Sequence, residues 1–155
     1  MERTLVILKP DCVTRGLVGS VISRFEDKGL KIVATKMRKL DHKILEEHYA
    51  HLKEKPFFPG IVKFMSSGPA ICMIVEGKDV VEVMRKLCGA TNARNAESGT
   101  IRGDLSMSTQ CNIIHASDSK ESAEKEIKRF FTPDEICSWE RVQEDFFYAP
   151  DERKA

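Results

Sequence analysis

Four short apolar runs, separated by segments with helical spacing, constrain the fold of this chain more than any other feature of its sequence. The runs span residues 4–9, 31–40, 69–77 and 111–115. They are rich in β-branched and other apolar residues and are bounded by proline, glycine or polar residues, which is typical of strands. Each run is therefore predicted to form a strand of one sheet.

Helical periodicity fills the intervals between these runs. A first helix is predicted before the Lys28-Gly29 pair, a typical helix end, from apolar residues at helical spacing: Leu17, Val18, Val21, Ile22 and Phe25. Residues 42–53 are predicted to be helical, and a short helix is predicted to begin near Gly60.

Two later helices are predicted from capping signals. Asp79 with Glu82, and Asp118 with Glu121, have the spacing of a capping box at a helix start. The first of these helices ends at Gly89. The second has an inward face made of Ala123, Ile127, Phe130 and Phe131.

The resulting order is βαββαβ with additional helices. Elements of these lengths in this order favour an α+β fold in which an antiparallel or mixed sheet is covered by helices, the split-βαβ arrangement. A chain of 155 residues suits a single domain spanning residues 1–155, with residues 149–155 as a loose C-terminal tail.

Charge and cysteine content exclude several classes of protein. Lys+Arg total 25 against 24 Asp+Glu, so neither a membrane coat nor a general nucleic-acid binder is expected. No apolar run approaches the ~18 residues that span a bilayer, and the apolar stretch in "MERTLVILKPD" is too short for the secretory signal of an exported protein, so none is expected. Five cysteines without a C-x-x-C pair predict reduced thiols rather than disulfides or a zinc site, and hence the cytosol.

The segment between Gly89 and Cys111 shows no period. An irregular stretch of more than ~15 residues inside a compact domain is usually functional or disordered. Its polar residues among glycines point to function: Thr91, Asn92, Arg94, Arg102 and Asp104.

His115 ends an apolar run directly before a predicted helix start. An imidazole there can reach solvent while its second nitrogen is held by a neighbour, and Glu126, which borders the buried stripe of the next helix, is the candidate neighbour. The alternative is a satisfied histidine at the edge of the core and a solvated acid.

Phosphate is the predicted electrophile for a nucleophilic histidine here. Arg85 and Arg102 offer forked donors, Thr91 a hydroxyl and Lys9 a point charge. Each alone is more often a surface residue, so their convergence on one cleft is the deciding observation. Neither a P-loop nor a G-x-G-x-x-G motif occurs, which disfavours a P-loop or Rossmann nucleotide site.

The remaining histidines and a pair of phenylalanines have less specific signals. His48 and His51 are three apart on a predicted helix, but nothing completes a metal site, so structural or solvent roles are predicted for both, and likewise for His42. Of Phe57 and Phe58, at least one is expected to stay exposed, where its ring can stack on a base.

Taken together, the motifs of this chain resemble those of the nucleoside diphosphate kinases. The matching stretches are "TLVILKPD", "RGLVGSVISRFE", "HYAHLKEKPFFPGIVKFMSSGP", "GATN", "GTIRGD" and "NIIHASDS…SAEKEI", in the family's order and spacing over residues 2–148. The resemblance implies a ferredoxin-like four-stranded antiparallel sheet. It also implies transfer of a γ-phosphoryl group from a nucleoside triphosphate to a nucleoside diphosphate, with Mg²⁺ on the phosphates.

The resemblance further implies a role for each matching residue. His115 is the expected nucleophile, through Nδ1, in a ping-pong reaction, and Glu126 and Ser117 hold its ring. The residues expected to contact the phosphates are Arg85, Thr91, Arg102 and Tyr49. The ribose is bound by Lys9 and Asn112, and Lys9 is also counted as catalytic. Phe57 stacks on the base, next to Ile61 and Thr109. Asp118 positions the metal through water. Stacking without readout of base edges predicts broad base specificity.

Some positions depart from the family pattern. Cys12 and Ala116 stand where glycine is common, and a thiol at Cys12, near the ribose, is either oxidation-sensitive or an inert loop cysteine. Ala93 replaces a common proline, which bears on subunit contacts. Thr109 and Gln110 replace a smaller apolar pair flanking the base, which bears on base affinity.

Two other classes of function remain as alternatives. One is a scaffold that kept the fold and lost turnover, although no catalytic residue is missing. The other is a single-stranded nucleic-acid binder, disfavoured by the near-zero charge and by the lack of paired sheet aromatics. The resemblance implies a homo-oligomer, and the long segment after Phe131 favours a hexamer over a tetramer.

Overall fold

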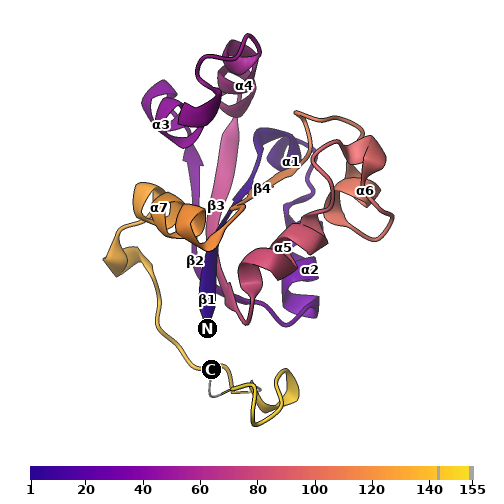
Figure 1. Cartoon of the computed structure of the whole chain (residues 1–155), viewed down its shortest axis with the longest axis vertical. Coiled ribbons are helices and arrows are strands. Elements are labelled where there is room, and N and C mark those ends of the chain that lie inside the picture. Colours follow the sequence, from indigo (N-terminus) through magenta and orange to yellow (C-terminus); the bar gives the residue numbers. More distant parts are fainter. Residues whose placement is uncertain (143, 154–155) are drawn as a thin grey trace.

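The computed structural model describes residues 1–142 and 144–153 and is built on a four-stranded sheet (Figure 1). The strands lie in the order β2-β3-β1-β4, and every neighbouring pair is antiparallel. Their bounds are β1 (Glu2–Leu8), β2 (Lys31–Lys39), β3 (Pro69–Gly77) and β4 (Ile114–Ala116). The predicted α+β class, the ferredoxin-like topology and the antiparallel sheet are confirmed.

Helices connect the strands. The α-helices are α1 (Pro10–Thr14), α2 (Val18–Asp27), α3 (His42–His48), α4 (Phe58–Met65), α5 (Val80–Cys88), α6 (Ile101–Leu105) and α7 (Lys120–Phe130). Short 3₁₀ helices are η1 (Ala50–Leu52), η2 (Ala93–Asn95), η3 (Pro133–Glu135) and η4 (Glu144–Phe146).

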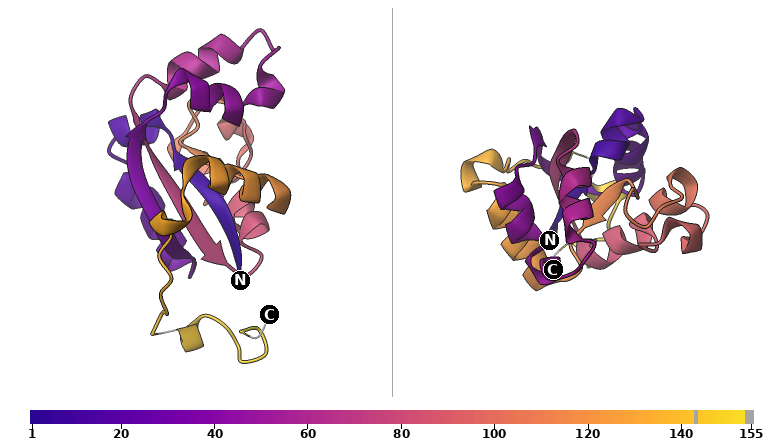
Figure 2. Two further views of the ribbon diagram at one scale, coloured as in Figure 1. Left: turned by 90° about the vertical axis from the view of Figure 1, so that its left-hand side faces the viewer. Right: turned by 90° about the horizontal axis from the view of Figure 1, so that it is seen from above.

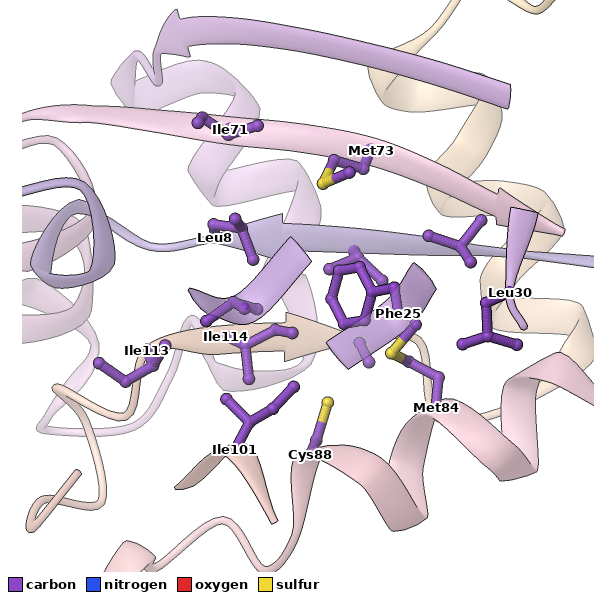
Figure 3. Packing of buried hydrophobic residues seen from close by; sticks show 14 of the residues in the cluster. Leu8, Phe25, Leu30, Ile71, Met73, Met84, Cys88, Ile101, Ile113 and Ile114 are labelled. Carbon is purple, nitrogen blue, oxygen red and sulfur yellow. The ribbon is translucent and has the colours of Figure 1, made fainter. Parts of the chain in front are cut away.

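The central strand β1 is buried from Thr4 to Leu8 because helices cover both faces of the sheet (Figures 1 and 2). Alternate side chains of a strand point to opposite faces. Val6 and Leu8 therefore pack with α2 and α5, in the core region of Figure 3, whereas Leu5 and Ile7 pack with α3, α4 and α7. Each buried aliphatic side chain contributes roughly 2 kcal/mol to folding.

The last strand differs from its prediction over residues 111–115. Ile113 has a φ of 74°, and the N–H of Ile114 donates to the carbonyl of Asn112 at 2.8 Å. This two-residue hydrogen bond closes a γ-turn, a conformation that no apolar pattern signals. The strand therefore begins only at Ile114 and carries His115 at its centre.

Both predicted capping boxes are wrong. Asp79 precedes α5 in the left-handed region, with a φ of 50°, and its side chain makes no capping hydrogen bond. At α7 the cap is Ser119, whose Oγ accepts from the N–H of Ser122 at 3.1 Å. Placing the cap at Ser119 leaves the carboxylate of Asp118 outside the helix start.

Other element bounds also moved. Helix α1 was not predicted, the helix predicted over 42–53 ends at His48 and continues as η1, and α4 begins at Phe58 rather than near Gly60. The region 89–111, predicted to be irregular, contains η2 and α6.

Local chemistry explains how the "GTIRGD" stretch folds. Thr100 caps α6 by accepting from the N–H of Gly103 at 3.0 Å. A Cβ on Gly103 would lie 2.0 Å from the carbonyl oxygen of Glu97, so only glycine fits. Asp104 accepts from the N–H of Gly99 and from Arg24, so it braces the loop.

After α7 the chain runs along the edge of the sheet. The N–H of Cys137 donates to the carbonyl of Val33 at 2.8 Å, and Arg141 donates to the carbonyls of Gly29 and Leu30. In the predicted tail 149–155, Arg153 donates to the carbonyl of Tyr148, and residues 154–155 lie outside the described residues. No helix within the described ranges is long and apolar enough to cross a bilayer.

Candidate active site

The orientation of His115 follows from strand periodicity. On β4, Ile114 and Ala116 belong to the core shared with α2 and α5, so His115 between them points to the opposite face. His115 pairs with Ile7 of β1, and the helices covering that face are α3, α4 and α7. The strand thus presents the imidazole to residues from two helices.

Glu126 of α7 is the hydrogen-bond partner of this imidazole. Its Oε2 lies 3.0 Å from Nε2 of His115 and accepts from Oγ of Ser117 at 2.7 Å. Burial acts to raise the pKa of Glu126, but the hydrogen bonds from His115 and Ser117 contribute to lowering it overall. Because the ionised carboxylate can only accept, Nε2 of His115 carries the proton and Nδ1 keeps its lone pair.

His48 of α3 packs directly against the nucleophile candidate, which the sequence did not reveal. The ring centroids of His48 and His115 lie 4.5 Å apart at 80°, in an edge-to-face arrangement. Burial, then the neighbouring His115, lowers the pKa of His48 to about 3, so this ring is neutral. Arg129 lies 3.4 Å from its Nδ1. One signal in the sequence could have indicated that His48 is buried: it lies on the same apolar face of its helix as Ile44 and Leu45.

His48, His115 and Glu126 offer ligand atoms within 4.8 Å of one another, a spacing that would suit a metal ion. The surrounding contacts favour a hydrogen-bonded cluster instead. The Oε2 atom of Glu126 already accepts two hydrogen bonds, and the Arg129 guanidinium beside Nδ1 of His48 repels a cation.

A cavity of about 540 Å³ opens in front of this cluster and gathers residues from distant parts of the chain. Twelve of the residues singled out in the sequence line it: Lys9, Tyr49, Phe57, Ile61, Arg85, Thr91, Arg102, Thr109, Asn112, His115, Asp118 and Glu126. Ser117 does not line it, because it is fully buried behind Glu126. His48, His51 and Gln110 also line the cavity.

Lys9 and Asn112 form one end of the cavity. Nζ of Lys9 donates to Oδ1 of Asn112 at 2.6 Å, and Nδ2 of Asn112 donates to the carbonyls of Thr91 and Thr109, each at 2.8 Å. Burial, followed by the positive charge of Arg102, lowers the pKa of Lys9 to about 8. The two side chains are therefore locked in place and present a cation and an amide to a ligand.

Two arginines with different environments line the cavity. Arg102 donates to the carbonyls of Gly89 and Ile114 at 2.8 and 2.7 Å, which fixes its guanidinium, while its buried Nε has no partner among the described residues. Arg85, on α5, is exposed. Tyr49 lies near His115, with 6.5 Å between the ring centroids, and burial raises the pKa of the Tyr49 hydroxyl.

Part of the cavity lining is aromatic. Phe57, at the start of α4, is 53% exposed, whereas Phe58 is 7% exposed and belongs to the core, so the expectation that one of the pair stays exposed is confirmed. Nε2 of Gln110 donates to the carbonyl of Gly60 at 2.9 Å, which ties the loop before β4 to α4 beside this ring.

Asp118 is the cavity carboxylate suited to a divalent cation. A hydrogen bond from Ser122, together with the charges of Arg85 and His115, holds its pKa below the usual value despite some burial. An exposed, ionised carboxylate beside an arginine-lined cavity fits Mg²⁺, which is commonly held by one or two carboxylates together with waters and substrate phosphates.

Cys12 is an unreactive core residue. It is fully buried, and burial, followed by the charge of Asp11, raises the pKa of its thiol to about 12. Because the thiolate is the reactive form, the inert reading of this cysteine is favoured over oxidation sensitivity.

Comparisons with known proteins agree with this geometry. The model of the family "Nucleoside diphosphate kinase" matches residues 2–136. A nucleoside diphosphate kinase of Parabacteroides distasonis is 57% identical over 152 residues, covering 98% of this chain and 99% of the relative, and one of Archaeoglobus fulgidus is 54% identical over 148 residues, covering 96% and 98%.

A solved structure has a closely similar fold. The halophilic nucleoside diphosphate kinase of Halobacterium salinarum, in complex with CDP, superposes with a TM-score of 0.93 at 45% identity, covering 96% of this chain and 99% of that one. Family, fold and phosphotransferase class, each predicted from the sequence, are therefore confirmed, and the chain belongs to the nucleoside diphosphate kinase family.

Proposed function

We propose that His115 carries the phosphoryl group between the two nucleotides. Nδ1 attacks the γ-phosphorus of a nucleoside triphosphate, an N–P bond forms, the bond to the bridging oxygen breaks, and the nucleoside diphosphate leaves with the bond's electron pair. An oxygen of the terminal phosphate of a second diphosphate then attacks the phosphohistidine and the N–P bond breaks. The observation that carries this proposal is the hydrogen bond of Nε2 to Glu126, which leaves Nδ1 as the nucleophile.

Positioning and charge are the main contributions expected from the surrounding residues. Arg102, held rigidly by two carbonyls, and Arg85 stabilise the charge that spreads over the transferring oxygens, and Thr91 and Tyr49 complete the phosphate contacts. Because β4 and α7 hold the imidazole before substrate arrives, little reorganisation is needed for attack.

The sugar and the base occupy neighbouring parts of the cavity, because Lys9 and Asn112 bond the carbonyls of Gln110 and Thr109. Lys9 and Asn112 contact the ribose hydroxyls, and the exposed ring of Phe57 stacks on the base, flanked by Ile61 and Thr109. Stacking uses a face that every base has, which supports broad base specificity. The nucleotide-bound state of the Halobacterium salinarum relative supports nucleotides as ligands.

Nucleotide kinases of this family require a divalent cation, and we propose Mg²⁺, which Asp118 would hold through water. When bound, the ion neutralises negative charge on the phosphates. The side chain of Asp118 contributes an ionised carboxylate at the edge of the cavity, next to Arg85.

Intact-protein mass spectrometry tests the proposed function. Mixing with excess Mg·ATP should add one phosphoryl group, and a chase with GDP should remove it and yield GTP. His115→Ala is the matched control, which should fold and show no adduct. Folded wild-type protein without an adduct would exclude the phosphohistidine route and favour the scaffold alternative.

We also propose a homohexamer built from dimers, in preference to a tetramer. The long segment after α7 leaves Trp139, Val142 and Phe146 exposed, as suits a segment that crosses onto a neighbouring subunit. Light scattering on the purified protein distinguishes six copies from four. Residues 1–155 as one domain and a cytosolic location remain predictions, the latter supported by five free cysteines.

A further inference from the structure

An unusual backbone turn joins the ribose-binding end of the cavity to the nucleophile strand. Ile113 has a φ of 74°, in a region that β-branched residues rarely adopt. The hydrogen bond from Ile114 N–H to Asn112 C=O makes it the centre of a γ-turn, the strained form of that turn. Asn112 lies on one side of the turn and β4, with His115, on the other.

The strained residue is held from both sides by one distant segment. Its N–H donates to Oδ2 of Asp11 at 3.1 Å, across a separation of 102 positions, and its carbonyl accepts from the N–H of Lys9 at 2.8 Å. The side chain of Ile113 is fully buried in the core shown in Figure 3. A sparsely populated backbone conformation persists only where its surroundings over-determine it, as they do here.

We propose that Asp11 is a positioning residue for phosphoryl transfer, because its carboxylate clamps the γ-turn at Ile113 and so sets Asn112 and His115 relative to one another. This inference rests on the proposed function. Asp11 does not line the cavity and acts only through the turn. Asp11 lies in the first turn of α1, and Lys9 precedes that helix. Nζ of Lys9 bonds Asn112 at 2.6 Å, so the start of α1 aligns the sugar contacts and the strand together.

A second route for Asp11 is purely electrostatic and must be separated from the clamp. Its negative charge helps to keep Lys9 protonated, against burial and the charge of Arg102. Asp11→Asn removes the charge but keeps an acceptor oxygen, whereas Asp11→Ala removes both. The clamp requires only the acceptor.

The experiment compares kcat/KM for a ribonucleoside diphosphate and for its 2′,3′-dideoxy analogue. Asp11→Ala should lower kcat/KM for the ribonucleotide by about tenfold or more, since a misplacement near 1 Å can cost 100-fold. Asp11→Ala should also reduce the preference for ribose, measured as kcat/KM for the ribonucleotide divided by kcat/KM for the dideoxy analogue, because Asn112 is no longer aligned with the ribose. Assayed well below the Lys9 pKa of about 8, Asp11→Asn should stay near wild type in both respects.

Two results would overturn the proposal. Equal losses in Asp11→Asn and Asp11→Ala would assign the effect to charge, and an unchanged substrate ratio in Asp11→Ala would remove the positioning role. A wild-type enzyme that forms phosphohistidine but shows no preference for ribose would instead contradict the sugar contacts of the proposed function. Absence of phosphohistidine in wild type would contradict the proposed chemistry itself.

A rescue pair tests the turn directly. Ile113→Gly and Ile113→Ala both remove most of the buried side chain, but only glycine adopts positive φ without strain. In the Asp11→Ala background, Ile113→Gly should restore kcat/KM several-fold more than Ile113→Ala does. Each double variant is compared with the single Ile113 variant that keeps Asp11, so that the cost of the lost side chain cancels. If Asp11→Ala fails to fold, the yield of folded protein is compared between the two double variants instead. Equal outcomes for glycine and alanine would refute the clamp.

Discussion

Glu126 holds His115 by a hydrogen bond of 3.0 Å between Oε2 and Nε2, and it accepts a second hydrogen bond from Ser117 at the same oxygen. The Oε2 atom thus fixes one imidazole tautomer. This relationship determines which nitrogen is free to attack, and its chemical consequence can be measured.

Glu126→Gln should slow phosphoryl transfer by roughly tenfold or more with little change in nucleotide affinity, because it acts on the orientation and charge of the ring rather than on substrate contacts. Single-turnover formation of phosphohistidine, with ADP binding measured by calorimetry, separates the two effects. An unchanged rate would exclude Glu126 from orienting His115 for phosphoryl transfer.

Phe57→Ala should raise KM about tenfold for every nucleoside diphosphate, because stacking contributes roughly 1–3 kcal/mol per base. The increase should be similar for purines and pyrimidines, since only the ring face is used. Phe57→Tyr keeps that face and is the matched control. A KM that rises for one base alone would point to edge recognition, with Gln110 as the neighbouring candidate.

Nucleotide binding should weaken as the pH rises through about 8, the pKa of the buried Lys9. The ammonium form, which bonds Asn112 at 2.6 Å, is then lost and the ribose contacts with it. We expect KM to increase between pH 7 and 9.5 in the wild type, and Lys9→Met to show no such increase.

Thermal unfolding over the same pH range is the control for this behaviour. The pKa of Lys9 is lower in the folded protein than its ordinary 10.5, so the unfolded chain binds more protons between pH 8 and 10.5. The contribution of this group to stability therefore rises with pH while nucleotide affinity falls. A fall in both together would indicate alkaline unfolding instead.

Peroxide sensitivity should not depend on Cys12, which is fully buried and whose pKa is raised to about 12. Cys12→Ala should lose activity in hydrogen peroxide at the wild-type rate. Cys111 is exposed next to Asn112, so Cys111→Ser is the informative comparison. Protection by Cys12→Ala would restore the oxidation-sensitive reading.

Local patterns predicted much of the fold. Strands β1, β2 and β3 follow from short apolar and β-branched runs bounded by turn residues. The helical stripe of α7 follows from periodicity, because a helix buried on one side repeats its apolar residues with the period of its backbone. The cap of α7 was misplaced because Asp118 and Ser119 are both good cap residues, and backbone geometry selects Ser119.

What the sequence determined by itself was the order of strands and helices, the family, and the residue types that phosphoryl transfer needs. The tertiary structure alone decided which residues meet. Arg129 reaches His48 across 81 positions and Asp11 reaches Ile113 across 102, and neither pairing leaves a periodic trace in the chain. The physical reason is that periodicity reports which face of an element is buried, whereas contacts between elements depend on how the sheet orders its strands, here β2-β3-β1-β4.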